Sequence, residues 1–267
     1  MGVKALILRT AGTNCDEETD FAFRLAGAET KKLHVNVLRE RPNVLSEYHI
    51  LAIPGGFSYG DDLGAGTVLA NELLTLLRPP LEQFIEDGKL VIGICNGFQV
   101  LVKTGLLPAI NRWSQEATLT INDSHRFEDR WVYLKAPRSR CVLVEDEESI
   151  YLPVAHAEGK FVPRDNGVYQ DMRDNGQIVF WYTNPEGESA GYPWNPNGSV
   201  EDIAAVCDPT GRVLGMMPHP ERHSLPIHHP RWTREGLSEQ GDGIVLFERA
   251  VGFARQHLVE KDVAHKE

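Results

Sequence analysis

The sequence of 267 residues has no excess of basic residues, few cysteines and no long apolar run. It holds 27 Lys and Arg against 38 Asp and Glu, a formal net charge of −11. This charge argues against a nucleic-acid-binding surface, because phosphate contacts require clustered basic side chains. The four cysteines, at positions 15, 95, 141 and 207, form no CxxC pair and have no regular spacing. A disulfide framework or a zinc site is therefore not predicted, and a reducing cytoplasm is expected.

Other signals are missing as well. The opening stretch MGVKALILRTAG lacks the apolar region and the cleavage site of a signal peptide. No apolar run approaches the roughly 20 residues that cross a bilayer, and no GxxxxGK[ST] phosphate loop occurs. A hydrophobic content of 42% is enough for one sizeable core. Since no convincing linker is present, we predict a single domain, 1–267, with a core at about 1–225 and a C-terminal loop and helix at 226–267.

What the chain does contain is an alternation of two patterns over its first hundred residues. Strand-like runs occupy 4–9, 32–38, 48–56 and 89–95, and helical spacing occupies 16–28, 67–77 and 97–105. This alternation predicts an α/β fold of the doubly wound kind, with a mostly parallel sheet and helices on both faces. Later β-like segments between 117 and 183, and a hairpin pattern within 201–222, predict a small antiparallel portion. The segment 223–241 has the composition of a surface loop, and 242–258 has the spacing of an amphipathic helix.

A single cysteine stands where a buried strand is expected to become a helix. Cys95 ends the run KLVIGIC, and Gly93 and Gly97 flank it. Such glycines permit a tight strand-to-helix turn that projects the side chain above the carboxyl end of the sheet, where α/β folds bind ligands. The helix N-terminus favours the thiolate, and the backbone N–H of Asn96 is a candidate oxyanion donor. The pattern also fits a small buried apolar Cys95, which remains an open alternative.

A nucleophilic cysteine needs a base, and His219 in VLGMMPHPER is the best placed of the ten histidines. In an extended segment Glu221 would share its face and could orient the imidazole, as in a catalytic triad. A structural His219 or a metal site with His223 are alternatives, although the prolines disfavour the helix that such i,i+4 ligation needs. We predict no metal. The turn IPGGFSYGDDLGAGT offers a second oxyanion donor, since Gly55 and Gly56 allow a backbone N–H to approach a ligand closely.

Together these motifs resemble the class I glutamine amidotransferases. GICNGFQ at 93–99 is similar to the nucleophile motif of that family and PHPE at 218–221 to its His-x-Glu motif. The stretches RTAGTNCDEE, PGGFSYGDDLGAG, AHAEGKF and NPNGS narrow the resemblance to one group, the glutaminase subunits of phosphoribosylformylglycinamidine synthase in purine biosynthesis. The resemblance covers about residues 1–225. The loop departs from the usual SYGDYLRCGA of the family, and AHGEG is replaced by AHAEG.

The resemblance implies a flavodoxin-like glutaminase without a cofactor of its own. Cys95 would attack the glutamine amide and form a thioester, with His219 as acid and base and Glu221 as its orienting partner. Gly56 and Asn96 would supply the oxyanion hole, and Gln99 would contact the substrate. Ammonia would pass to a synthetase subunit that uses ATP and Mg²⁺ on formylglycinamide ribonucleotide, with a small accessory subunit.

Three other functions are compatible with parts of the pattern. The chain could be a glutaminase that serves another synthetase, a γ-glutamyl hydrolase, or a binding subunit that has kept the fold without catalysis. Only the GGFSYGD and NPNGS stretches exclude the first two functions, and they do so by resemblance alone. The presence of Cys95, His219 and Glu221 together argues against the third.

Overall fold

The computed structural model describes residues 2–260 and contains one large sheet and one small sheet. The large sheet has the strand order β2-β1-β3-β4-β11-β10-β9-β6-β7, and β5 pairs with β8 in the small one. The strands are β1 (Lys4–Arg9), β2 (Glu29–His34), β3 (Ile50–Ile53), β4 (Leu90–Ile94), β5 (Ala117–Thr120), β6 (Glu128–Lys135), β7 (Ser149–His156), β8 (Lys160–Pro163), β9 (Ile178–Thr183), β10 (Ile203–Cys207) and β11 (Val213–Met216). Pairs from β2 across to β11 are parallel, and pairs from β11 to β7 are antiparallel. The predicted α/β fold class is confirmed.

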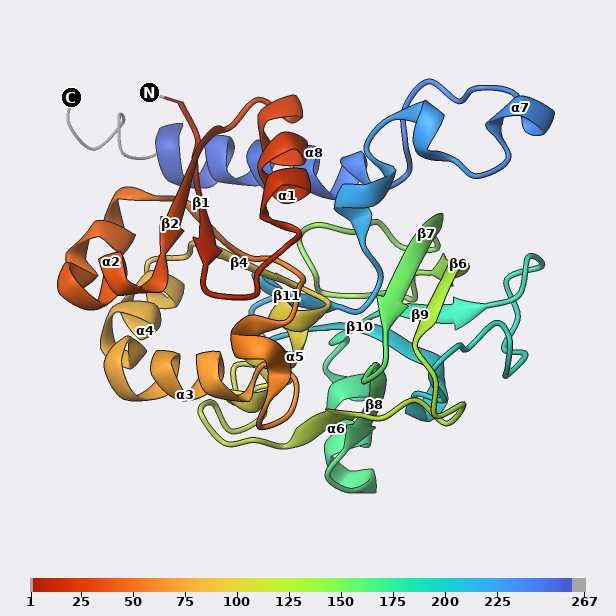
Figure 1. Cartoon of the computed structure of the whole chain (residues 1–267), viewed down its shortest axis with the longest axis horizontal. Coiled ribbons are helices and arrows are strands. Elements are labelled where there is room, and N and C mark those ends of the chain that lie inside the picture. Colours follow the sequence, from red (N-terminus) through yellow and green to blue (C-terminus); the bar gives the residue numbers. More distant parts are fainter. Residues whose placement is uncertain (1, 261–267) are drawn as a thin grey trace.

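Helices cover both faces of the large sheet (Figure 1). They are α1 (Asp16–Leu25), α2 (Val35–Glu40), α3 (Thr67–Leu76), α4 (Arg78–Glu86), α5 (Asn96–Lys103), α6 (Asn166–Asp174), α7 (Trp232–Glu235) and α8 (Ile244–Ala254). α1 and α8 pack together on one face, where the rings of Phe23 and Phe247 meet edge to face at 4.9 Å, and α3 and α5 pack on the other.

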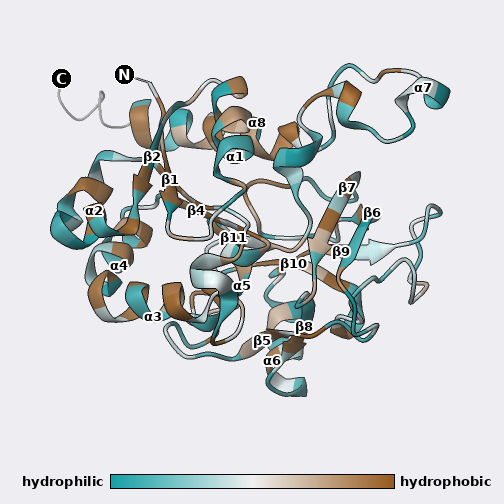
Figure 2. Ribbon diagram, in the orientation of Figure 1, coloured by the Kyte–Doolittle hydropathy of each residue, from teal (hydrophilic) through white to brown (hydrophobic). Residues whose placement is uncertain are grey.

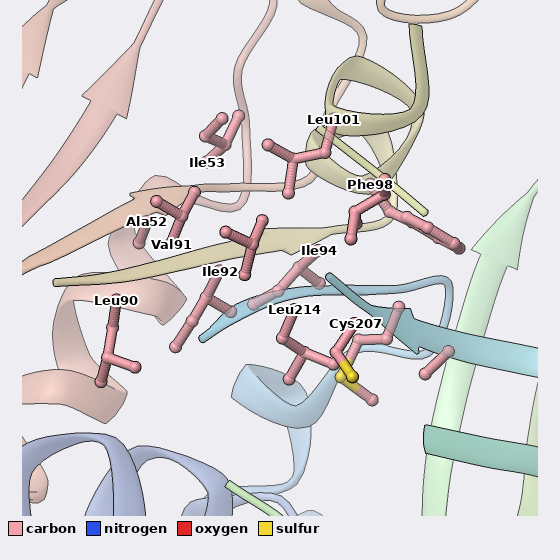
Figure 3. Packing of buried hydrophobic residues seen from close by; sticks show 14 of the residues in the cluster. Ala52, Ile53, Leu90, Val91, Ile92, Ile94, Phe98, Leu101, Cys207 and Leu214 are labelled. Carbon is pink, nitrogen blue, oxygen red and sulfur yellow. The ribbon is translucent and has the colours of Figure 1, made fainter. Parts of the chain in front are cut away.

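The core is centred on β4, whose five residues are all buried. Its side chains pack against β3, β11 and α5, as seen for Ile53, Ile94, Phe98 and Leu214 in Figure 3. Figure 2 shows the hydrophobic residues concentrated in these central strands and on the inner sides of the helices. A strand buried on both faces reads as an unbroken apolar run, and this is why β4 was predictable.

Several parts of the chain differ from the prediction, and α4, α6 and β8 have no counterpart in it. The expected strand at 32–38 is wrong, because β2 ends at His34 and α2 begins at Val35, where the His34 side chain caps the helix by accepting the N–H of Asn36. The alternating apolar residues of 32–38 therefore belong partly to the end of β2 and partly to α2. The edge strand β7 was not predicted, because Pro153 interrupts its pattern; proline is tolerated at a sheet edge, where its missing N–H breaks no ladder.

The C-terminal segment packs on the main body. Six residues of α8 are buried in the same hydrophobic cluster as β1 and α1. This packing supports a single domain, which stays a prediction, and residues 261–267 of the predicted C-terminal segment lie outside the described residues. Within residues 2–260, no helix combines the length and apolarity needed to cross a membrane.

Candidate active site

Cys95 lies at the turn between β4 and α5, as the sequence predicts. Its backbone has φ +51° and ψ −104°, a left-handed conformation that costs a non-glycine residue free energy and that is common at functional sites. A Cβ on Gly97 would lie 1.9 Å from the carbonyl oxygen of Ile53, so only glycine lets α5 start this close to β3. The side chain of Cys95 is 6% exposed, and its Sγ lies 3.7 Å from the carbonyl oxygen of Ala155.

His219 and Glu221 form a buried pair after β11. The Nδ1–H of His219 donates to Glu221 Oε1 at 2.6 Å, and the two residues are 2% and 1% exposed. The predicted hydrogen bond is confirmed, but the predicted extended segment is wrong. Pro220 begins a 3₁₀ turn, η4 (Pro220–His223), because its fixed φ suits the first position of a helix.

Two opposing effects set the charge of His219. Burial disfavours the protonated imidazole, but the Glu221 carboxylate and the nearby Cys95 sulfur outweigh burial, so the pKa of His219 lies well above its ordinary value. A raised pKa makes the imidazole a stronger base toward a neighbouring thiol. Its Nε2 has no hydrogen-bond partner among the described residues and is free to take part in proton transfer.

The free edge of β7 holds these groups in place. The carbonyl of Pro153 accepts the backbone N–H of His219 at 2.8 Å, and the carbonyl of Tyr151 lies 2.8 Å from Nδ1 of His223. The C-terminal segment supports the turn from the other side, since the N–H of Gly243 donates to the carbonyl of His223 at 2.9 Å. The segment after residue 225 is therefore part of the scaffold of the site.

The glycine-rich loop after β3 is tied to α5 by a polar network. Asn96 Oδ1 accepts the N–H of Ser58 at 3.1 Å, and its Nδ2 donates to Asp61 at 3.1 Å and to Gln99 Oε1 at 2.9 Å. Gln99 Nε2 donates to the carbonyl of Glu158 at 2.6 Å. Gln99, which the family resemblance assigns to the substrate, thus has both ends of its amide bonded to protein groups.

Gly55 and Gly56 lie where the loop after β1 crosses the end of β3. Thr13 and Gly56 form an antiparallel bridge, and the N–H of Cys15 donates to the carbonyl of Gly55 at 3.2 Å. Gly56 has φ +141°, and a Cβ there would lie 2.8 Å from the backbone N of Asn14. The two glycines allow this close crossing directly beside His219.

The sequence did not predict that Cys15 and Arg222 lie at this site. Cys15 is 1% exposed and Arg222 Nη2 donates to its Sγ at 3.1 Å. Burial raises the pKa of the Cys15 thiol above its ordinary value, although His219 and Arg222 act in the opposite direction. The TNCDEE stretch carried a resemblance but no chemistry that placed Cys15 beside the base. Only the crossing of the loops after β1 and β3 brings it there.

We expect Gly55→Ala to cut the rate of a reaction that uses Cys95 and His219 about a hundredfold, which is about 2.7 kcal/mol of barrier. A Cβ on residue 55 would lie 2.9 Å from Cε1 of His219 and 3.0 Å from Sγ of Cys15, so the imidazole must shift. The measurement is the steady-state rate of the catalysed reaction. The matched control is Gly252→Ala in α8, where a Cβ meets nothing within 4 Å. A wild-type rate for Gly55→Ala would contradict this placement of the base.

Comparison with known proteins identifies relatives of this chain in sequence and in structure. Residues 2–254 match the model of the CobB/CobQ-like glutamine amidotransferase domain. The sequence is 51% identical over 256 residues to phosphoribosylformylglycinamidine synthase subunit PurQ of Dehalococcoides mccartyi, covering 95% of this chain and 98% of that protein. It is 40% identical to the protein of the same name from Archaeoglobus fulgidus, covering 94% and 97%. The structure of PurLQS from Thermotoga maritima aligns with a TM-score of 0.72 at 30% identity, covering 95% of this chain and 99% of that one.

Proposed function

Because this chain belongs to the CobB/CobQ-like glutamine amidotransferases, and within them to the family of PurQ, we propose that it is the glutaminase subunit of a phosphoribosylformylglycinamidine synthase. In this role it hydrolyses glutamine to glutamate and ammonia for a separate synthetase. The observation that carries the proposal is the buried Cys95, held at a strained turn beside the hydrogen-bonded pair of His219 and Glu221.

In the proposed reaction His219 Nε2 takes the proton of the Cys95 thiol, and the thiolate attacks the carboxamide carbon of glutamine. The backbone N–H groups of Asn96 and Gly56 stabilise the oxyanion that forms. The tetrahedral intermediate collapses to a γ-glutamyl thioester, and His219 gives its proton to the departing ammonia. His219 then takes a proton from water, which attacks the thioester and releases glutamate. Glu221 keeps the imidazole in the required tautomer throughout.

Ammonia is the product that the synthetase uses. We place ATP and Mg²⁺ on that subunit, which would convert formylglycinamide ribonucleotide to formylglycinamidine ribonucleotide in purine biosynthesis in the cytoplasm. A small accessory subunit completes the proposed complex. The similarity to the Thermotoga maritima PurLQS structure supports a multisubunit assembly of this kind.

We expect a diazoketone analogue of glutamine to alkylate Cys95 and to spare Cys15, Cys141 and Cys207. All four thiols are free and buried, so accessibility alone does not separate them. Cys95 and Cys15 both precede a helix and both lie near His219, so neither feature separates them. Cys95 stands at the strained turn between β4 and α5, whereas the sulfur of Cys15 accepts a hydrogen bond from Arg222. Peptide mapping after labelling, with excess glutamine as the protecting control, measures the distribution. Label found chiefly on Cys15 would identify Cys15 as the nucleophile and refute the proposed role of Cys95.

A further inference from the structure

The proposed reaction leaves two buried groups beside His219 without a role. One is the thiol of Cys15, and the other is Oε2 of Glu221, which has no hydrogen-bond partner among residues 2–260. Glu221 is 1% exposed, and its Oε1 alone meets the imidazole. A buried carboxylate oxygen without a donor is costly, so a group that satisfies it would bind favourably.

These groups converge on one point. Cys15, His219 and Glu221 each offer a ligand atom, and the three atoms lie within 4.8 Å of one another. They are the one such group of His, Cys, Asp and Glu side chains in the described part of the chain. Tetrahedral zinc, with bonds of about 2.0–2.3 Å, separates its ligand atoms by about 3.3–3.8 Å, so the most widely separated of the three atoms need to close by at most about 1–1.5 Å. Ligation through His219 Nδ1 and Glu221 Oε1, which are 2.6 Å apart, requires this pair to separate by about 0.7 Å.

We propose that Cys15, His219 and Glu221 form a binding site for a thiophilic divalent cation such as Zn²⁺, and that its occupancy switches the glutaminase off. The cation would have a thiolate, an imidazole and a carboxylate as ligands, with water in the fourth position. This ligand set selects Zn²⁺ over Mg²⁺, which prefers oxygen ligands and an octahedral shell. The Mg²⁺ that the synthetase needs therefore does not occupy it.

Occupancy blocks His219 whichever ring nitrogen the cation takes. On Nδ1, it replaces the hydrogen bond to Glu221 and keeps the imidazole from becoming protonated. On Nε2, it occupies the lone pair that would accept the Cys95 proton. The inhibitory consequence rests on the proposed function, but the binding site itself does not.

The side chain of Arg222 competes with the cation for the sulfur of Cys15. Its Nη2 lies 3.1 Å from Sγ of Cys15, so the guanidinium must leave before a metal can bind the sulfur. Glu18 lies 3.7 Å from Nε of Arg222 and can hold the side chain at the surface, where a third of it is already exposed. We therefore expect the wild-type protein to bind Zn²⁺ at micromolar concentrations. The affinity for Zn²⁺ should rise about tenfold when residue 222 has no charge.

The test uses Co²⁺ as a spectroscopic probe and Zn²⁺ as its competitor, on the full chain. A cobalt–thiolate absorption band should form in the wild type and in Cys95→Ala, and Zn²⁺ should remove it. The band should be lost in Cys15→Ser, with Zn²⁺ affinity at least about tenfold lower, while Cys207→Ser, a substitution at another buried cysteine, should leave it unchanged. Mg²⁺ should not displace Co²⁺.

A second variant protects the test against misfolding. Arg222→Gln should tighten Zn²⁺ binding, a gain that damage to the fold does not produce. A band that persists in Cys15→Ser and disappears in Cys95→Ala would overturn the proposal, as would no binding by the wild type at millimolar Zn²⁺. The absorption band is measured without glutamine, so it does not depend on glutaminase activity. A chain that binds the cation but lacks glutaminase activity would refute the proposed function without refuting the metal site.

Discussion

Replacing Cys95 with alanine should abolish glutamine-dependent synthesis by the assembled enzyme and leave ammonia-dependent synthesis nearly unchanged. The thioester needs the sulfur of Cys95, and no other thiol lies at the N-terminus of α5. Loss of the nucleophile in a triad lowers the rate by a factor on the order of 10⁴ or more. The synthetase chemistry does not use this residue, so free ammonia should bypass the defect.

The experiment compares both nitrogen sources in one complex. Product formation is measured with glutamine and then with an ammonium salt, and assembly of the variant is checked by gel filtration. Cys207→Ser is the matched control, since Cys207 is also a buried cysteine but lies on β10 in the core. Equal loss of both activities in a variant that still assembles would refute the division of labour between the two subunits.

The second large effect concerns the partner. The chain alone should turn over glutamine about a hundredfold more slowly than the complex, because free release of ammonia would waste glutamine. We place the control in the loop Gly55–Gly66 after β3, which carries a proposed oxyanion donor. Tyr59 and Asp61 in this loop have φ +56° and +55°, a left-handed conformation that costs about 1–2 kcal/mol for each such residue.

A strained loop of this kind needs little energy to change state. A shift of about 2.7 kcal/mol in its equilibrium changes the competent population about a hundredfold. Glutamate release should be measured for the chain alone, then with the synthetase, and then with its nucleotide and substrate. If the isolated chain is as fast as the complete complex, control by the partner is excluded and the glycines serve only a fixed turn.

The sequence predicted the parts of the site that local pattern determines. The run of β-formers into Cys95, with glycines at 93 and 97, marked the strand, the turn and the helix, and the structure has all three. The pairing of His219 with Glu221 was predicted from their spacing, although the reason given for it was wrong. Proline sets a 3₁₀ turn there, and this turn also brings the two side chains together.

What the sequence could not predict are contacts between segments far apart in the chain. Cys15 reaches His219 only because the loop after β1 crosses the end of β3, and a crossing leaves no periodic signal near residue 15. The same holds for the free edge of β7, whose carbonyl groups hold the turn that carries His219. Its own pattern is obscured by Pro153.

The most direct test of the central claim is to trap the covalent intermediate on Cys95. The assembled enzyme is mixed with radiolabelled glutamine, quenched in acid during turnover, digested and mapped. We predict protein-bound label on the peptide that contains Cys95, labile to hydroxylamine as a thioester is, and none on that peptide in Cys95→Ala. An enzyme that releases glutamate rapidly without bound label, or that carries it on the peptide containing Cys15, would contradict the account.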